Sequence, residues 1–237
     1  MSESTSGEIE HRPTKRKVAY RTSWLEIKDW PQILQLQSRV LENGGSDGMT
    51  RRSASYLRAL LDRWGHVIGV WVGEQLIGIT AISVYRPAIV RVARIAGIPE
   101  KDRAQSVLFE FSMVHPEYVG NRLQRKMIER LAQLLQQKYQ PKYVCFAVAA
   151  DNQYSLNTAF GFGALVSGIQ MTRNRKIILH AYRPVDENNW PQIEGAVEVP
   201  CDDFKQHCRM IRDGMVGYAM CLQDGRVVIR YGRQMNP

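Results

Sequence analysis

The stretch VHPEYVGNRLQRKM, Val114 to Met127, decides how this chain folds. A run of strong β-formers, VLFEFSMV (107–114), leads into it, and the amphipathic pattern NRLQRKMIERLAQLLQQKY (121–139) follows. A Pro, an aromatic residue, a Gly and an Asn separate the two runs. The pattern predicts a strand that turns sharply into a basic amphipathic helix.

Such a corner is suited to binding phosphate. The first turn of a helix has unpaired backbone N–H groups, and the helix dipole places positive charge at the same end. Gly120 lets the backbone come close to a ligand, and Asn121 is a residue type that tolerates the positive φ of a turn. We therefore expect a pyrophosphate cradle at residues 119–125.

Composition limits the classes of protein that the chain can represent. Its 237 residues are 44% hydrophobic and 23% charged, which is typical of a globular protein. No apolar run approaches the roughly 18 residues of a membrane span, so we expect no membrane partner. Four cysteines without paired spacing predict reduced thiols, no metal site and a cytoplasmic location. The net charge of +9 favours anionic partners, with a solvated basic surface as the equal alternative.

The chain divides into three parts by pattern. Residues 1–17 are polar and predict a disordered leader. Residues 18–184 alternate helical and strand patterns, which predicts an α/β or α+β fold with a mixed sheet, although the basic stretch 86–103 looks irregular. Residues 185–237 predict a C-terminal extension, a helix and a β-hairpin turning at Asp224-Gly225, packed on the main domain.

Two motifs carry a resemblance to a known family. MVHPEYVGNRLQRKMIERL (113–131) resembles the cofactor motif of the GNAT superfamily of acyl-CoA-dependent N-acyltransferases, a strand, [Arg/Gln]-x-x-Gly-x-[Gly/Ala] and a helix. AVAADNQYSLNTAFGFGA (147–164) resembles the family's second signature, a strand, an Asn and a short helix. The order of elements from Val18 to about Arg183 fits throughout. The resemblance implies a mixed central sheet with splayed strands, flanked by helices.

The resemblance also implies a site that takes acetyl-CoA as co-substrate, with no metal. The backbone of Met113 and Val114 would meet the pantetheine arm and the acyl carbonyl, and Asn152 would lie near the thioester. The pyrophosphate would be held by the backbone N–H groups of Gly120, Asn121, Arg122, Gln124 and Arg125. An acceptor amine would then attack the thioester directly.

The sequence departs from the family pattern at four positions. Val119 replaces the first Arg or Gln, and Arg122 replaces a Gly. Gln124 stands at the last position of the motif, where Gly or Ala is usual and Gln is frequent in one subgroup. The Arg122 guanidinium could pair with a phosphate, or its side chain could crowd the cradle, and the sequence does not decide between these. Ala159 stands where the family's acid Tyr would fall, so no Tyr acid is expected.

Glu110 is the candidate general base. It alternates with Ser112 and Val114 on one face of the predicted strand, and a neutral amine needs a proton acceptor when it attacks. The alternative is that Glu110 pairs with one of the nearby loop arginines. His115 precedes a Pro at the corner, and we expect it to be structural.

Three functions are compatible with these features. The first is an N-acetyltransferase acting on a primary amine of unspecified identity, with an acidic acceptor slightly favoured. The second is a GNAT-fold binding or regulatory module with weakened catalysis, as Val119, Arg122 and Ala159 suggest. The third is a nucleic-acid-associated protein, which rests on net charge alone. Whether the C-terminal extension completes the acceptor cleft or forms a homodimer interface is left open.

Overall fold

The computed structural model describes residues 6–42, 51–186 and 191–235. These residues form two compact units. The first unit combines the chain up to Tyr85 with Glu110–Gln140, and the second combines Arg86–Phe109 with the chain from Pro141 onward. Strand β5 (Ser106–Val114) gives its first half to the second unit and its second half to the first.

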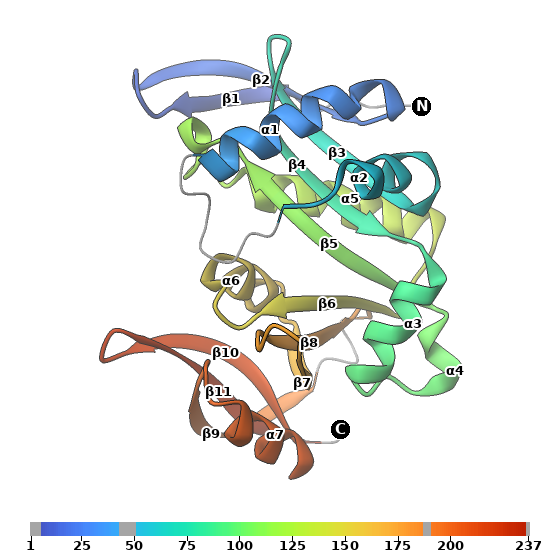
Figure 1. Cartoon of the computed structure of the whole chain (residues 1–237), viewed down its shortest axis with the longest axis vertical. Helices are drawn as coiled ribbons and strands as arrows, with labels where there is room; N and C mark the ends of the chain where they lie inside the picture. Colours follow the sequence, from blue (N-terminus) through green and yellow to red (C-terminus); the bar gives the residue numbers. More distant parts are fainter. Residues whose placement is uncertain (1–5, 43–50, 187–190, 236–237) are drawn as a thin grey trace. The chain divides into compact units, whose positions relative to one another are not determined.

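The first unit is a meander of antiparallel strands with helices on its faces (Figure 1). Its strand order is β1-β2-β3-β4-β5. The elements are β1 (Ser6–His11), β2 (Arg16–Trp24), η1 (Ile27–Asp29), α1 (Trp30–Glu42), α2 (Ala54–Ala59), the π-helical turn η2 (Leu60–Trp64), β3 (Gly65–Val72), β4 (Gln75–Ser83), η3 (Pro116–Tyr118) and α5 (Leu123–Lys138).

The core of the first unit lies between α1, α2 and one face of β3 and β4. It includes Ile33 and Leu36 of α1, Leu57 of α2 and Ile79 of β4, each at most 1% exposed. Helix α5 packs on the other face: a Cβ atom built on Gly78 would lie 3.4 Å from the terminal methyl of Met127. The amphipathic stripe predicted for α5 is therefore its buried face.

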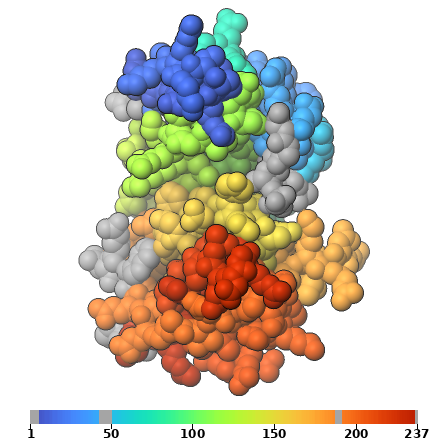
Figure 2. All heavy atoms as spheres, turned by 90° about the vertical axis from the view of Figure 1, so that its left-hand side faces the viewer, coloured from blue at the N-terminus to red at the C-terminus, as the bar shows by residue number. Residues whose placement is uncertain are grey.

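The predicted disordered leader is wrong from Ser6 onward, where β1 pairs with β2; residues 1–5 lie outside the described residues. Ile9 is buried, and the register places Gly7 opposite Tyr20. A Cβ on Gly7 would lie 2.9 Å from the Tyr20 ring, so glycine lets this ring lie across β1. The blue hairpin lies against the yellow-green surface of the β5–α5 segment in Figure 2.

The second unit has the strand order β5-β6-β8-β7-β10-β11-β9. Strands β5 and β6 are parallel, with Ser106–Leu108 opposite Tyr143–Cys145, and the other pairs described in this unit are antiparallel. The elements are α3 (Arg86–Ile95), α4 (Glu100–Arg103), β6 (Tyr143–Ala149), α6 (Gln153–Gly161), β7 (Leu165–Met171), β8 (Ile177–Pro184), β9 (Gln192–Pro200), α7 (Phe204–Arg212), β10 (Met215–Gln223) and β11 (Arg226–Met235).

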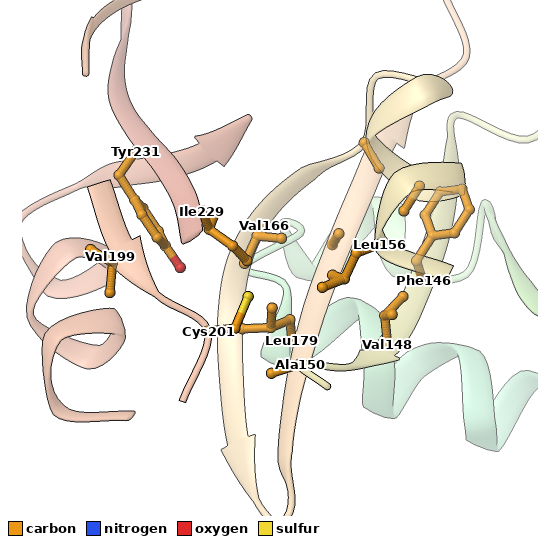
Figure 3. Close-up of a cluster of buried hydrophobic side chains, with 13 residues drawn as sticks. Phe146, Val148, Ala150, Leu156, Val166, Leu179, Val199, Cys201, Ile229 and Tyr231 are labelled. Carbon is orange, nitrogen blue, oxygen red and sulfur yellow. The ribbon is translucent and has the colours of Figure 1, made fainter. Parts of the chain in front are cut away.

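One hydrophobic cluster joins the two sides of position 184 (Figure 3). It contains Val166 and Leu179 from β7 and β8 together with Ile229 and Tyr231 from β11. Strand β10 also pairs with β7 at Gly217 and Val166. The boundary between a main domain and an extension at 184/185 stays a prediction.

One further expectation differs from the structure. The stretch 86–103, expected to be irregular, contains helices α3 and α4. Cys201 precedes α7, which begins at Phe204, and Cys208 lies within that helix. His207 directs its Nδ1 to the Tyr231 hydroxyl at 2.8 Å. Within the described ranges, no group of three or more His, Cys, Asp or Glu side chains is arranged to hold a metal ion.

Candidate functional site

The corner between β5 and α5 lies in the first unit and is built from short, tightly fastened turns. After Val114, the His115 N–H donates to the Ile77 carbonyl at 2.7 Å, which ties the corner to β4. The turn η3 follows, and then Gly120 adopts φ 95°. A Cβ on Gly120 would meet no protein atom within 4 Å, so its surroundings are open to a ligand.

The backbone N–H groups at the start of α5 are unpaired within the described part of the chain. The first backbone hydrogen bond at the start of α5 runs from the Lys126 N–H to the Arg122 carbonyl at 3.1 Å. Within residues 6–42, 51–186 and 191–235, the N–H groups of residues 120–125 donate to no protein acceptor. Because α5 is 16 residues long, its dipole adds positive potential at this end. The corner can therefore bind an anion such as a diphosphate.

Arg122, and not Asn121, adopts the left-handed conformation predicted for this turn. Arg122 is the N-cap of α5, with φ 56° and ψ 26°, and it is exposed. Asn121 is not among the residues with positive φ, so the expectation for its backbone is wrong. A left-handed conformation costs a non-glycine residue about 1–2 kcal/mol, which explains why glycine is common at this position of the motif.

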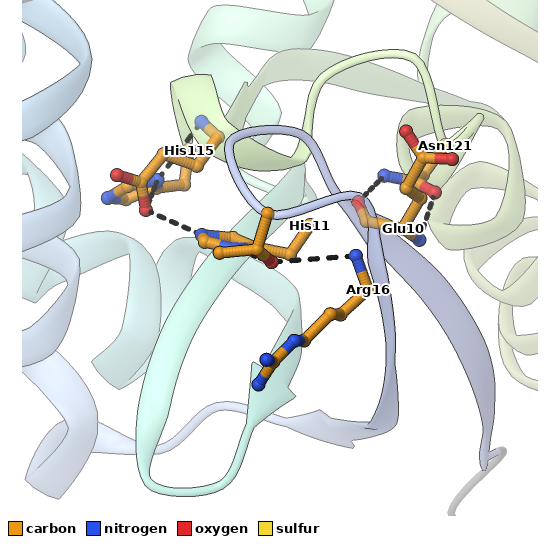
Figure 4. A network of polar contacts seen from close by, with 7 residues as sticks. Glu10, His11, Arg16, His115 and Asn121 are labelled. Carbon is orange, nitrogen blue, oxygen red and sulfur yellow. Dashed lines mark hydrogen bonds and ion pairs between the residues drawn. The ribbon is translucent and has the colours of Figure 1, made fainter.

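The Asn121 side chain is engaged with β1 instead. Its Oδ1 accepts from the Glu10 N–H at 2.8 Å, and its Nδ2 donates to the Glu10 carbonyl at 2.7 Å (Figure 4). The Nδ2 also donates to the Tyr118 carbonyl at 3.0 Å. Sequence reasoning assigned only the Asn121 backbone to the site. No local signal points to Glu10, because the two residues are 111 positions apart.

The other predicted cofactor residues of the first unit lie on both sides of the corner. Gln124 is half-buried in the first turn of α5, and the exposed Arg125 donates from Nε to Glu129 at 2.9 Å. Met113 is 2% exposed in the core, and Val114 is half-buried. Their roles toward a cofactor stay predictions.

Glu110 of β5 lies near Tyr56, in the first turn of α2. Burial raises the pKa of the Tyr56 hydroxyl. The charge of the Glu110 carboxylate and a hydrogen bond between the two side chains raise this pKa further, and Arg52 has a smaller, opposite effect. The Tyr56 hydroxyl is protonated at neutral pH, as an ordinary Tyr is, and can donate to the Glu110 carboxylate beside it. The Arg52 guanidinium lies 5.5 Å from the Tyr56 ring centroid and 5.6 Å from that of Phe111.

This neighbourhood was partly missed by the sequence reasoning. Tyr56 packs against the core of the first unit. Its hydroxyl contact with Glu110 could not be read from spacing, because 54 positions separate them.

Asn152 belongs to the second unit and caps α6. Its Oδ1 accepts from the Ser155 N–H at 2.9 Å. An Asn at the N-cap position commonly accepts such a hydrogen bond, so the Asn152 side-chain oxygen already accepts from the helix backbone. A role for Asn152 toward the thioester stays a prediction.

His115 is buried at 3% exposure, and its Nδ1 accepts from the Glu117 N–H at 3.3 Å. Burial lowers the pKa of this imidazole, Arg39 and His11 lower it further, and Glu117 opposes them. The ring stands edge-on to Tyr118, with 5.8 Å between centroids. These contacts are structural, in line with the expectation from sequence.

Comparison with solved structures identifies the fold. The ribosomal-protein-S18-alanine N-acetyltransferase of Escherichia coli matches with a TM-score of 0.53 at 15% identity, over 71% of this chain and 97% of its own. The ribosomal-protein-S5-alanine acetyltransferase of Vibrio fischeri matches with a TM-score of 0.54 at 13% identity, over 79% and 100%. A GNAT-family acetyltransferase of Streptococcus pneumoniae matches with a TM-score of 0.53 at 13% identity, over 70% and 99%.

The chain therefore has the fold of the GNAT acetyltransferases, and the fold predicted from its two motifs is confirmed. No protein-family model and no curated protein matches its sequence. None of the helices described is both long and apolar enough to cross a bilayer.

Proposed function

Because the chain has the fold of the GNAT acetyltransferases, we propose that it is an N-acetyltransferase that moves the acetyl group of acetyl-CoA to a primary amine. The observation that carries the proposal is the row of unpaired N–H groups at residues 120–125, at the start of a 16-residue helix and beside the open surface of Gly120. These donors and the helix dipole would hold the cofactor's diphosphate.

Glu110 is proposed as the general base. The amine must lose a proton as its nitrogen bonds to the acetyl carbon, and a nearby carboxylate can accept that proton. The C–S bond breaks in the same reaction, and the thiolate of CoA leaves. Tyr56 would orient the Glu110 carboxylate through the hydrogen bond between their side chains. With Ala159 in place of a Tyr, the thiolate takes its proton from solvent.

Acetyl-CoA titration by calorimetry tests the proposal. We expect the wild type to bind, and Gly120→Ala to weaken binding at least tenfold, because a side chain at φ 95° strains the backbone and a Cβ stands where the diphosphate approaches. Gly73→Ala is the matched control: Gly73 also has positive φ, 56°, and open surroundings, in the β3–β4 turn. Absence of heat at millimolar acetyl-CoA would remove the enzyme proposal.

Acetyl transfer to candidate acceptor amines is measured by the release of the CoA thiol. Peptides with N-terminal Ala or Ser come first, because two fold neighbours are named for an alanine of ribosomal proteins S18 and S5, and a third modifies the N-terminal serine of ribosomal protein L7/L12. Acidic and neutral versions of each peptide should be compared, since α3 exposes Arg86, Arg91 and Arg94. Tight binding of acetyl-CoA without turnover on any amine would support the alternative of a regulatory module.

A further inference from the structure

The Asn121 side chain forms a paired contact with the backbone of one residue of β1. Asn121 accepts from the Glu10 N–H and donates to the Glu10 carbonyl, at 2.8 and 2.7 Å (Figure 4). A carboxamide that donates to and accepts from the same residue imitates a neighbouring strand. Its second N–H holds the Tyr118 carbonyl at 3.0 Å, so the same side chain links β1 to the turn before the cradle.

The residues after Glu10 reinforce this contact. The Arg12 N–H donates to the Glu117 carbonyl at 2.9 Å. His11 places Nε2 3.3 Å from a Glu117 carboxylate oxygen, and its ring centroid is 5.2 Å from that of Tyr118. The end of β1 is therefore fastened to Glu117, Tyr118 and Asn121.

Asn121 adjoins the least relaxed backbone of the cradle. It lies between Gly120 at φ 95°, which glycine adopts readily, and Arg122 at φ 56°, which is unfavourable for a residue with a Cβ. A left-handed non-glycine residue persists only when its surroundings fix it. A cradle fixed before the ligand arrives binds more tightly, because the ligand does not bear the entropy loss of ordering it.

We propose that Asn121 is a positioning residue, which uses β1 as a brace to hold the N–H groups of residues 120–122 in their anion-binding arrangement. The N-terminal hairpin is thereby part of the cofactor site, although none of its atoms need touch the cofactor. This inference rests on the proposed binding of acetyl-CoA at the corner.

Glu10→Pro tests the brace without altering the corner. Proline removes the N–H that donates to Asn121. That N–H points away from β2, so the β1–β2 ladder keeps its bonds. Glu8→Pro is the matched control, because Glu8 lies two residues earlier on the same exposed side of the strand. By the same alternation the Glu8 N–H points away from β2, and outside the strand ladders no described residue accepts a backbone hydrogen bond from it.

The first readout is the Kd for CoA by calorimetry, with the thermal midpoint of each variant measured in parallel. Glu10→Pro and Asn121→Ala should each weaken binding about tenfold, while Glu8→Pro binds like the wild type. The double variant Glu10→Pro/Asn121→Ala should be no weaker than Asn121→Ala alone, because both changes break the same contact. Wild-type affinity in Glu10→Pro would overturn the inference.

The second readout is independent of any ligand. Backbone ¹⁵N order parameters at residues 120–122 should fall from about 0.85 toward 0.6 in Glu10→Pro and stay unchanged in Glu8→Pro. If the wild type failed to bind CoA, the proposed function would be refuted. The order parameters would still test whether the contact between Glu10 and Asn121 makes residues 120–122 rigid. Equal rigidity of residues 120–122 in both proline variants would refute the brace.

Discussion

Arg122 combines an unfavourable backbone conformation with a position beside the unpaired N–H groups of the cradle. Its φ of 56° and ψ of 26° belong to the left-handed region, and its side chain makes no capping hydrogen bond. Non-glycine residues held in such conformations are found preferentially at functional sites. The guanidinium is exposed at the point where we propose that the diphosphate binds.

Arg122→Gly and Arg122→Ala separate the effect of the backbone from that of the side chain. Glycine relieves about 1–2 kcal/mol of left-handed strain and adds about 0.4–1 kcal/mol of unfolded-state entropy, so we expect a net gain of about 1 kcal/mol in urea denaturation. Alanine keeps the strain, so its stability should stay near that of the wild type.

The CoA affinity of the same two variants decides the role of the Arg122 side chain. If the guanidinium pairs with a phosphate, both variants should bind CoA about tenfold more weakly, since both lack the charge. If the side chain crowds the cradle, both should bind more tightly. Weaker binding by Arg122→Gly alone would contradict both interpretations and assign the effect to the backbone.

Glu110→Gln tests the proposed base. The amide cannot accept the proton, so we expect the rate of acetyl transfer to fall about 10²–10⁴-fold at neutral pH and less at high pH, where more amine is already neutral. Glu74→Gln is the control, an exposed carboxylate in the β3–β4 turn of the same unit. A pH–rate profile of the wild-type shape in Glu110→Gln would eliminate Glu110.

At the scale of elements, the predictable segments are those with a strong local pattern. The β10–β11 hairpin turns at Asp224 and Gly225 as predicted, and both residues have positive φ, 50° and 75°. Aspartate and glycine are residue types that adopt this geometry at low cost, so the sequence at the turn itself specifies the hairpin. Helix α5 is equally local, since its apolar stripe matches its buried face.

The elements that could not be predicted from the sequence either lack such a pattern or carry charged residues that break it up. Strand β1 has one buried apolar residue, Ile9, and is held by β2 and Asn121. Strand β9 (Gln192–Pro200) is largely exposed and forms by pairing with β11. Helix α3 does carry a stripe, Ile89, Val92 and Ala93, but its arginines and β-branched residues made the segment look irregular.

At the scale of the whole molecule, a buried histidine sets an acid limit on stability. His180 is 3% exposed in β8, between Ala147 of β6 and Gly168 of β7. Neither of its ring nitrogens has a hydrogen-bond partner among the described residues. Burial, with a smaller contribution from Arg91, lowers the pKa of His180 to about 4.

This shift predicts a loss of stability in acid. The unfolded chain binds the His180 proton near pH 6.5 and the folded chain only near pH 4, so stability is complete above pH 6.5 and falls as the pH drops toward 4. Between pH 7 and 5, the wild type should lose about 2 kcal/mol more than His180→Leu in urea denaturation. Burial also lowers the pKa of His115 and His207, so the difference between the two proteins isolates His180. Parallel pH dependences would contradict the assignment.

The sequence by itself determined the corner. Strand formers before Val114, Gly120 in the turn and the apolar stripe of α5 act over a few residues, through local backbone preference and helical periodicity. Only the tertiary structure decided which side chains complete the site. Glu10 reaches Asn121 across 111 positions, and Tyr56 reaches Glu110 across 54. Such contacts depend on how strands pair and helices pack, and no local spacing in the chain encodes them.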